Sequence, residues 1–321
     1  MPRTQSFEAR GGYLPIETDL LPANPVKPLQ VFVLLGERYV PYPAEGAVLT
    51  PDIRLELLER GIGTLYIHET QRPALRECLE EGLESVLRDP SVRPEIKSKV
   101  ICQTCLDQIE KLWLRPDART IAECKGVFRH TIDHIVAAGL IGLQEILRML
   151  SYDPSMYAHS VNVGLLGTAL AREALSLSSH DLREAGYAMF LHDIGKTRID
   201  RAILNKPGPL SEAEWRIMRR HPEMGHAILR KEGHLSAQAS ITTLQHHERG
   251  DGKGYPLGLK WSEIDPLGRI CNLVDSYDAL LASRPYKKGL TPFEALKIIR
   301  KEMRPGADRA LFRQFVRLLL T

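Results

Sequence analysis

Residues 181–196 read DLREAGYAMFLHDIGK, a helical pattern that runs directly into three polar side chains. The apolar positions recur three and four residues apart: Leu182, Ala185 and Met189. This spacing predicts a helix from about residue 180 whose inward stripe continues through His192, Asp193 and Lys196. A buried imidazole, carboxylate and ammonium are costly unless they pair with one another or bind a ligand. The segment therefore has two interpretations, a self-contained His-Asp-Lys network and a ligand site.

Further histidines and an aspartate lie on four other helical segments of the same half of the chain. His159 heads a helix whose inward face is apolar except for Asn162, and His221, in HPEMGH, lies where proline is tolerated at a helix start. His246 and His247 close a further helix, and Asp275 lies in a helix over residues 272–281. Imidazole and carboxylate ligands suit iron, manganese or zinc, and a shared carboxylate can bridge two ions.

A glycine-rich loop, GDGKGYP over residues 250–256, follows the paired histidines. Its three glycines allow positive φ and close backbone approach, and Tyr255 is held between glycine and proline. It is not a phosphate-binding P-loop, because Gly-Lys is followed by glycine and not by Ser or Thr. By itself the loop indicates only a tight turn.

The series HDIGK, HPEMG, HHERGDGKGYP and the later Asp275 resembles, in order, the motifs of the HD-GYP family within the HD phosphohydrolase superfamily. The resemblance covers roughly residues 125–321. It implies a helical domain with a two- or three-metal centre that hydrolyses the bacterial second messenger cyclic di-GMP to linear pGpG, with GMP as a further product.

The resemblance also implies the roles of individual residues. One divalent ion would be held by His159, His192, Asp193 and Asp275. The second would be held by Asp193, His221, His246 and His247, so that Asp193 bridges the two ions. Such cations lower the pKa of bound water. Iron and manganese are the expected metals. Asp193 and Lys196 are the expected catalytic residues, with Lys196 neutralising the scissile phosphate.

Substrate contacts are expected from five residues: Lys196, Tyr255, Arg284, Lys287 and Asp153. Without the resemblance, Arg284 would be interpreted as a surface or helix-capping residue. Some family members carry a glutamate one helical turn before the first histidine, associated with a third metal. Here that position is Ser155, a poor ligand for a hard divalent ion. Two metal ions per chain are therefore expected.

The fold class that we predict is mainly α, with a small α+β module over residues 1–73, a helical connector over 74–124 and an all-helical HD-GYP domain over 125–321. Strand-like runs at 31–35, 37–40 and 64–67, a helix at 52–60 stopped by Gly61, and many prolines indicate the first module. It resembles a small domain that often precedes HD-GYP domains, with a sensory or regulatory role. From Ala74 onward the apolar spacing is helical.

A second possible metal site is a zinc site formed by Cys102 and Cys105 with the downstream residues Cys124, His130 and His134. However, Cys102 and Cys105 also lie on a helical apolar stripe, where cysteine acts as a small hydrophobic residue. We favour that second interpretation.

Composition narrows the functional classes. The chain has 321 residues, of which 43% are hydrophobic and 26% charged, enough to bury a sizeable core. A net charge of +3 is too mild for a protein that coats nucleic acid, so no DNA partner is expected.

No apolar run approaches the ~20 residues that span a bilayer. The N-terminus lacks a signal-peptide pattern. Five cysteines form no disulfide framework, and we expect a cytoplasmic location.

Two rival functions remain beside the phosphodiesterase. The chain could be a cyclic-dinucleotide receptor or interaction module with little turnover, although its complete ligand set argues against this. It could also be another HD-type phosphohydrolase with a different nucleotide substrate, against which the GYP loop argues. Protein partners left open are a second copy of the chain and another signalling protein.

Overall fold

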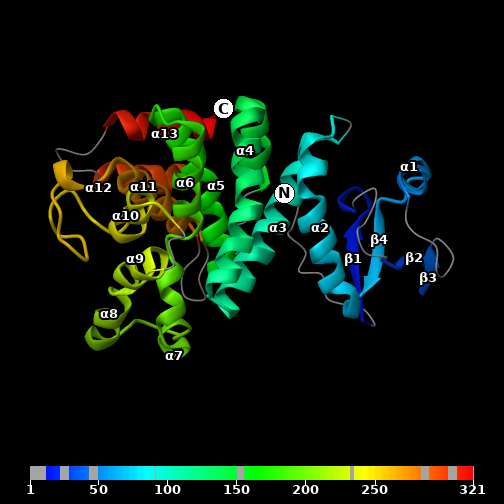
Figure 1. Cartoon of the computed structure of the whole chain (residues 1–321), viewed down its shortest axis with the longest axis horizontal. Helices are drawn as coiled ribbons and strands as arrows, with labels where there is room; N and C mark the ends of the chain where they lie inside the picture. The colour runs from blue at the N-terminus through cyan, green and yellow to red at the C-terminus, as the bar shows by residue number, and fades with distance from the viewer. Residues whose placement is uncertain are drawn as a thin grey trace. The chain divides into compact units, whose positions relative to one another are not determined.

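The computed structural model describes residues 12–21, 29–42, 50–90, 92–149, 155–231, 235–282, 289–302 and 309–320 (Figure 1). It is mainly helical and falls into two compact units, residues 1–104 and 105–321. Helix α3 (Pro94–Leu114) contains the boundary between them. Among the described residues, none of the helices combines the length and the apolar character that a membrane span requires.

The first unit is built on a four-stranded antiparallel sheet with strand order β1-β4-β2-β3 (Figure 1). The strands are β1 (Tyr13–Glu17), β2 (Val31–Leu35), β3 (Arg38–Tyr42) and β4 (Thr64–His68). Helices α1 (Pro51–Glu59) and α2 (Arg72–Arg88) and the 3-10 turns η1 (Thr18–Leu20) and η2 (Glu69–Gln71) complete it. One face of the sheet is the core: Ile16, Val31, Val33, Leu65 and Ile67 pack with Leu57 of α1 and Cys78 of α2.

Three of the four strands and helix α1 lie where the sequence predicts them, and Gly61 follows α1 with φ 76°. Strand β1 was missed because Pro15 interrupts it. A proline cannot donate a ladder hydrogen bond and is tolerated mainly in edge strands. Both edge strands of this sheet, β1 and β3, contain one, at Pro15 and Pro41.

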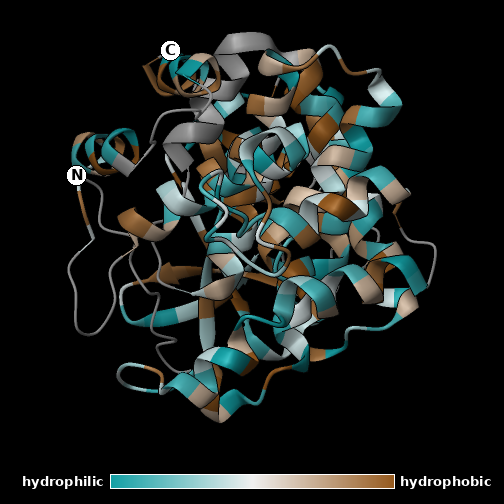
Figure 2. Cartoon of the chain, turned by 90° about the vertical axis from the view of Figure 1, so that its left-hand side faces the viewer, coloured by the Kyte–Doolittle hydropathy of each residue, from teal (hydrophilic) through white to brown (hydrophobic). Residues whose placement is uncertain are grey.

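The second unit is all helical, as predicted. Its elements are α4 (Ala118–Met149), α5 (Met156–Ala174), α6 (Ser179–Phe190), η3 (Ile194–Arg198), α7 (Arg201–Leu204), α8 (Glu212–Met218), α9 (His221–Lys231), α10 (Ala237–Gln245), η4 (Trp261–Glu263), α11 (Pro266–Leu281), α12 (Pro292–Glu302) and α13 (Arg309–Leu320). Bands of hydrophilic and hydrophobic residues alternate along these helices (Figure 2), as expected where one face of each is buried.

Helix α5 is the centre of this unit, because every residue from Ser160 to Ala171 is buried. It packs against α6 and α11. Contact with α6 is close because the helix presents glycines there: a Cβ on Gly164 would lie 2.2 Å from the Phe190 ring. His159 precedes Gly164 in α5, and His192 follows Phe190 just after the end of α6. The contact therefore brings both histidines to the same region of the unit.

Candidate metal centre

Three histidines of the site follow the last turns of helices α6, α8 and α10, and each is fixed in the same way. The Nδ1 atoms of His192, His221 and His246 lie 2.9, 2.8 and 2.7 Å from the backbone carbonyl oxygens of Met189, Met218 and Thr243. Carbonyl groups in the last turn of a helix lack intrahelical partners. Because a carbonyl can only accept, Nδ1 carries the proton in all three rings, and Nε2 is left as a lone pair.

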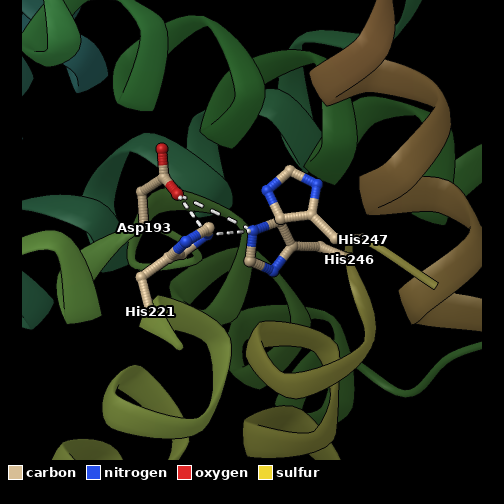
Figure 3. A group of neighbouring side chains, drawn as sticks. All are labelled: Asp193, His221, His246 and His247. Carbon is tan, nitrogen blue, oxygen red and sulfur yellow. Dashed lines mark hydrogen bonds and ion pairs between the residues drawn. The ribbon is translucent and has the colours of Figure 1, made fainter. Parts of the chain in front are cut away.

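These Nε2 atoms converge on Asp193, and Figure 3 shows this for His221 and His246. Asp193 Oδ1 lies 3.2 Å from His221 Nε2 and 3.7 Å from His246 Nε2, and Oδ2 lies 3.5 Å from His192 Nε2. His221 Nε2 and His246 Nε2 face each other at 3.1 Å. Two imidazole lone pairs at this distance repel unless a proton or a metal ion lies with them. Among the described residues, the fully buried His192 Nε2 has no hydrogen-bond partner, which also fits a metal ligand.

A second half of the site joins α5 to α11. His159 Nε2 lies 3.1 Å from Asp275 Oδ1 and 3.8 Å from Asp193 Oδ2. On the other side of the ring, His159 Nδ1 donates to Asp278 Oδ2 at 2.7 Å, and Asn162 Nδ2 donates to Asp278 Oδ1 at 2.7 Å. A carboxylate behind a histidine fixes the ring and increases its basicity as a ligand.

The structure brings together all seven residues that the sequence proposes as metal ligands. Potential ligand atoms form two groups, within each of which all atoms lie within 4.8 Å of one another: Asp193, His221, His246 and His247 in one, and His159, His192 and Asp275 in the other. Asp193 also approaches His159 and His192 of the second group. This placement is compatible with a carboxylate shared between two ions, although metal ligation itself stays a prediction.

Burial determines the charge of most of the imidazoles. It lowers the pKa of His192 to about 3 and lowers the pKa values of His221 and His247. Burial also opposes protonation of His159, but the hydrogen bonds to Asp275 and Asp278 outweigh it and raise its pKa to about 10.

Both carboxylates of the centre stay charged. Burial disfavours the ionised form of Asp193, yet Lys196 and His192 outweigh it and hold its pKa well below the usual range. For Asp275, the hydrogen bond from His159 and the nearby His247 likewise overcome burial and lower the pKa. Two carboxylates among several neutral imidazole lone pairs form a donor set that suits a divalent transition metal.

Lys196 turns back onto Asp193 in η3. Its Nζ lies 2.5 Å from Asp193 Oδ2, and 20% of its side chain is exposed. The preceding residue must be glycine, since a Cβ on Gly195 would lie 1.9 Å from the His221 carbonyl oxygen and 2.6 Å from the Gly225 nitrogen. Gly195 therefore allows η3 and α9 to approach closely enough for Asp193 and His221 to meet.

The glycine-rich loop places Tyr255 against the site. Its ring centroid is 4.8 Å from that of His247. The buried Glu248 holds this loop by accepting backbone hydrogen bonds from Leu257, Gly258 and Leu259. Sequence reasoning assigned Glu248 no role, although a glutamate between paired histidines and a glycine-rich loop is placed to cap the loop.

Asp278 was also missed, and Asn162 was expected on the inward face of its helix but was given no role. The available signal was spacing, because Asp278 follows Asp275 by three residues and so shares its helix face, and Asn162 follows His159 by three. Ser155 is the N-cap of α5, where its Oγ accepts from the Ala158 N–H. Three proposed substrate contacts, Asp153, Arg284 and Lys287, lie outside the described residues.

Two of the cysteines proposed as alternative zinc ligands have contacts typical of core residues. Cys105 Sγ lies 3.5 Å from Thr131 Oγ1, and the Cys124 thiol donates to the Gln108 carbonyl at 3.4 Å. Burial raises the pKa of the Cys102 thiol to about 12. Within the described ranges, no group of three or more candidate ligands includes a cysteine.

Comparison with known proteins gives consistent similarities. The chain is 43% identical over 175 residues to a cyclic di-GMP phosphodiesterase of Pseudomonas aeruginosa, covering 54% of this chain and 42% of that one. It is 32% identical over 234 residues to a cyclic di-GMP phosphodiesterase of Thermotoga maritima, covering 70% and 62%. A 3'3'-cGAMP-specific phosphodiesterase of Vibrio cholerae is 37% identical over 159 residues, covering 50% and 34%. The chain thus spans less than two thirds of each of these relatives.

The fold is similar to that of a Bdellovibrio bacteriovorus protein described as an HDG"Y"P protein, with a TM-score of 0.65 and 18% identity over 96% of this chain and 100% of that one. The HD domain family model matches residues 148–311, about half of the chain, and this range contains all seven proposed metal ligands. The chain therefore belongs to the HD domain family, and the resemblance of its motifs to HD-GYP proteins is confirmed.

Proposed function

We propose that this chain is a metal-dependent phosphodiesterase that hydrolyses cyclic di-GMP to pGpG, with GMP as a further product. The observation that carries the proposal is the arrangement around Asp193. Two ligand groups lie beside one charged carboxylate, and the lone pairs of His221 and His246 face each other at 3.1 Å. The names of the Pseudomonas and Thermotoga relatives support the choice of cyclic di-GMP.

We assign the two ligand groups to two divalent ions, with Asp193 shared. Bound ions would supply a water of lowered pKa and positive charge for the scissile phosphate. The protein supplies the rest of the electrostatics. Lys196, partly exposed and held by Asp193, is placed to donate to a phosphate oxygen. Burial raises the pKa of Tyr255, so its hydroxyl stays protonated and can donate a hydrogen bond to substrate. Arg284, Lys287 and Asp153 are proposed as further substrate contacts on the motif resemblance.

We further propose that the metals are iron or manganese and that they number two. The Oγ of Ser155 caps helix α5 by accepting from Ala158, and a neutral hydroxyl does not offset the dehydration of another divalent cation. Elemental analysis of anaerobically purified protein should give two ions per chain. Three fully bound ions with Ser155 in place would contradict this, whereas a third found only in Ser155→Glu would support it.

The decisive experiment is anaerobic incubation of the iron- or manganese-loaded chain with cyclic di-GMP, followed by chromatography of the products. Formation of pGpG is expected from the wild type, and none from Asp193→Asn. Asp181→Asn is a matched control, because Asp181 is an exposed aspartate at the start of α6. Tight binding of cyclic di-GMP by the metal-loaded protein without any product would instead identify a receptor.

A further inference from the structure

The short helix α8 carries an exposed tryptophan, Trp215. Its N-terminus is fixed by a capping box between Ser211 and Glu214, and Lys206 Nζ lies 2.6 Å from Glu214 Oε2. These contacts hold the helix so that Trp215 and Arg219, four residues apart, share one face. Trp215 is 44% exposed.

Arg219 connects this tryptophan to the site. Its guanidinium carbon lies 5.9 Å from the centroid of the Trp215 ring and 5.7 Å from that of Tyr255. The Tyr255 ring in turn lies 4.8 Å from the ring of His247, one of the proposed metal ligands. An unbroken series of rings and one cation thus runs from His247 to the surface of the protein.

This series differs from an ordinary solvated helix face. Within the part of the chain that the structure describes, Arg219 forms no ion pair with a carboxylate, and its contacts are with the two aromatic rings. Among the residues that the structure describes, the neighbouring Arg216 has only a backbone contact within its own helix, from Nε to the Glu212 carbonyl oxygen. A guanidinium without a carboxylate partner and an exposed indole together match an aromatic ligand that carries hydrogen-bond acceptors.

We propose that Trp215 and Arg219 form a nucleobase platform that holds one guanine of the substrate and selects it over adenine. This inference rests on the proposed function. Bases stack on aromatic side chains irrespective of their identity, so the indole supplies affinity. Selection comes from the guanidinium, whose paired N–H groups match the O6 and N7 acceptors of guanine. Adenine presents an amino group at the position of O6, and a guanidinium cannot accept a hydrogen bond from it.

The test is steady-state kinetics of the metal-loaded full chain with cyclic di-GMP and, separately, cyclic di-AMP. Trp215→Ala should raise KM for cyclic di-GMP about tenfold or more, the usual scale of one lost base stack, with a much smaller change in kcat. Trp215→Phe keeps an aromatic surface and should recover most of the loss. Arg216→Ala removes an exposed arginine from the same helix and should behave as wild type.

Arg219 is tested by the preference between the two substrates. Arg219→Ala should lower the ratio of kcat/KM for cyclic di-GMP over cyclic di-AMP about tenfold or more. Arg219→Lys keeps the charge but not the planar pair of donors, so it should not restore the ratio. Metal content equal to wild type in each variant shows that the site is intact.

Three results would overturn the proposed platform. They are an unchanged KM in Trp215→Ala, a preserved substrate ratio in Arg219→Ala, and full restoration of the ratio by Arg219→Lys, which would show that the planar pair of donors does not select guanine. Failure of the proposed function would give a different result: the metal-loaded wild-type protein would form no product from cyclic di-GMP. In that event, calorimetry with GMP would still test whether Trp215 and Arg219 bind a guanine base. Binding that Trp215→Ala and Arg219→Ala both weaken would support it, and binding unaffected by either would reject it.

Discussion

Individual histidines of the candidate metal centre owe their orientation to the ends of helices. His192, His221 and His246 each donate Nδ1–H to a carbonyl three residues earlier, so the backbone itself selects the tautomer. In the described part of the chain, His159 has no such carbonyl partner and instead uses the side chain of Asp278. Three proposed ligands are therefore positioned by local structure and one by a contact between two distant helices.

Substitutions of Asp193 and of Lys196 should have different effects on metal binding and on turnover. Asp193→Ala removes the carboxylate that lies beside both ligand groups, so we expect loss of both metals. Lys196→Ala leaves the ligand atoms in place and should retain metal while slowing hydrolysis about a hundredfold or more. Elemental analysis and product chromatography on the same samples measure the two effects. If Lys196→Ala lost metal as completely as Asp193→Ala, the role that we propose for Lys196 would be wrong.

Asp278 should act on metal affinity through His159. Asp278→Asn replaces the charged acceptor of His159 Nδ1, so affinity at the site that includes His159 should fall about tenfold to a hundredfold, the usual effect of losing such a partner. Metal titration followed by competition with a chelator measures this. Asp133→Asn is the control, because Asp133 contacts Arg183 on the second unit's surface and no proposed ligand. Equal affinity in both variants would remove Asp278 from the centre.

At the scale of elements, the site depends on places where backbones approach closely. Gly195 lets η3 meet α9, and Gly164 lets α5 meet α6. At both positions the neighbouring atoms leave no room for a Cβ. The positions of Asp193 and of His159 relative to the other ligands depend on these two contacts.

Gly195→Ala should therefore damage both stability and metal binding. The clash is with backbone atoms, which cannot rotate away, so we expect a loss of at least about 1–3 kcal/mol in the free energy of unfolding. Gly126→Ala in α4 is the matched control, because nothing lies within 4 Å of its added Cβ. In the middle of a helix that substitution should stabilise by up to about 1 kcal/mol. Denaturant unfolding of both variants checks the pair, and an unchanged midpoint for Gly195→Ala would contradict the close approach.

For the whole molecule, every proposed ligand lies in the second unit. A fragment that starts at Pro94 retains α3 intact and should keep metal and phosphodiesterase activity. A fragment that starts at residue 125, the predicted start of the HD-GYP domain, should keep the ligands but be less stable. It lacks the part of α3 that holds buried Ile109 and Leu112, and it also lacks the first turns of α4, including the buried Cys124.

Thermal unfolding, metal analysis and turnover of the two fragments test this expectation. The shorter fragment should melt at a lower temperature, since it exposes the apolar surface that α3 covers. A folded, metal-loaded longer fragment without turnover would show that the first unit takes part in the reaction.

Much of this protein could be predicted from local pattern. Helical spacing predicted that the second unit is all helical, and the motif series identified seven residues that the structure places in two adjacent groups. The sequence failed where local rules conflict with position in the fold. Strand β1 contains a proline that only an edge strand tolerates, and edge position depends on sheet topology.

The sequence by itself determined which residues were available and which helix faces they occupy, because helical periodicity acts over a few residues. Tertiary structure alone decided which faces meet. His159 and Asp278 are 119 residues apart in the chain, and Arg219 lies between Trp215 and a Tyr255 that belongs to another segment. Such meetings depend on how side-chain shapes pack between helices, as where Gly164 accommodates Phe190, and no local pattern encodes the partner.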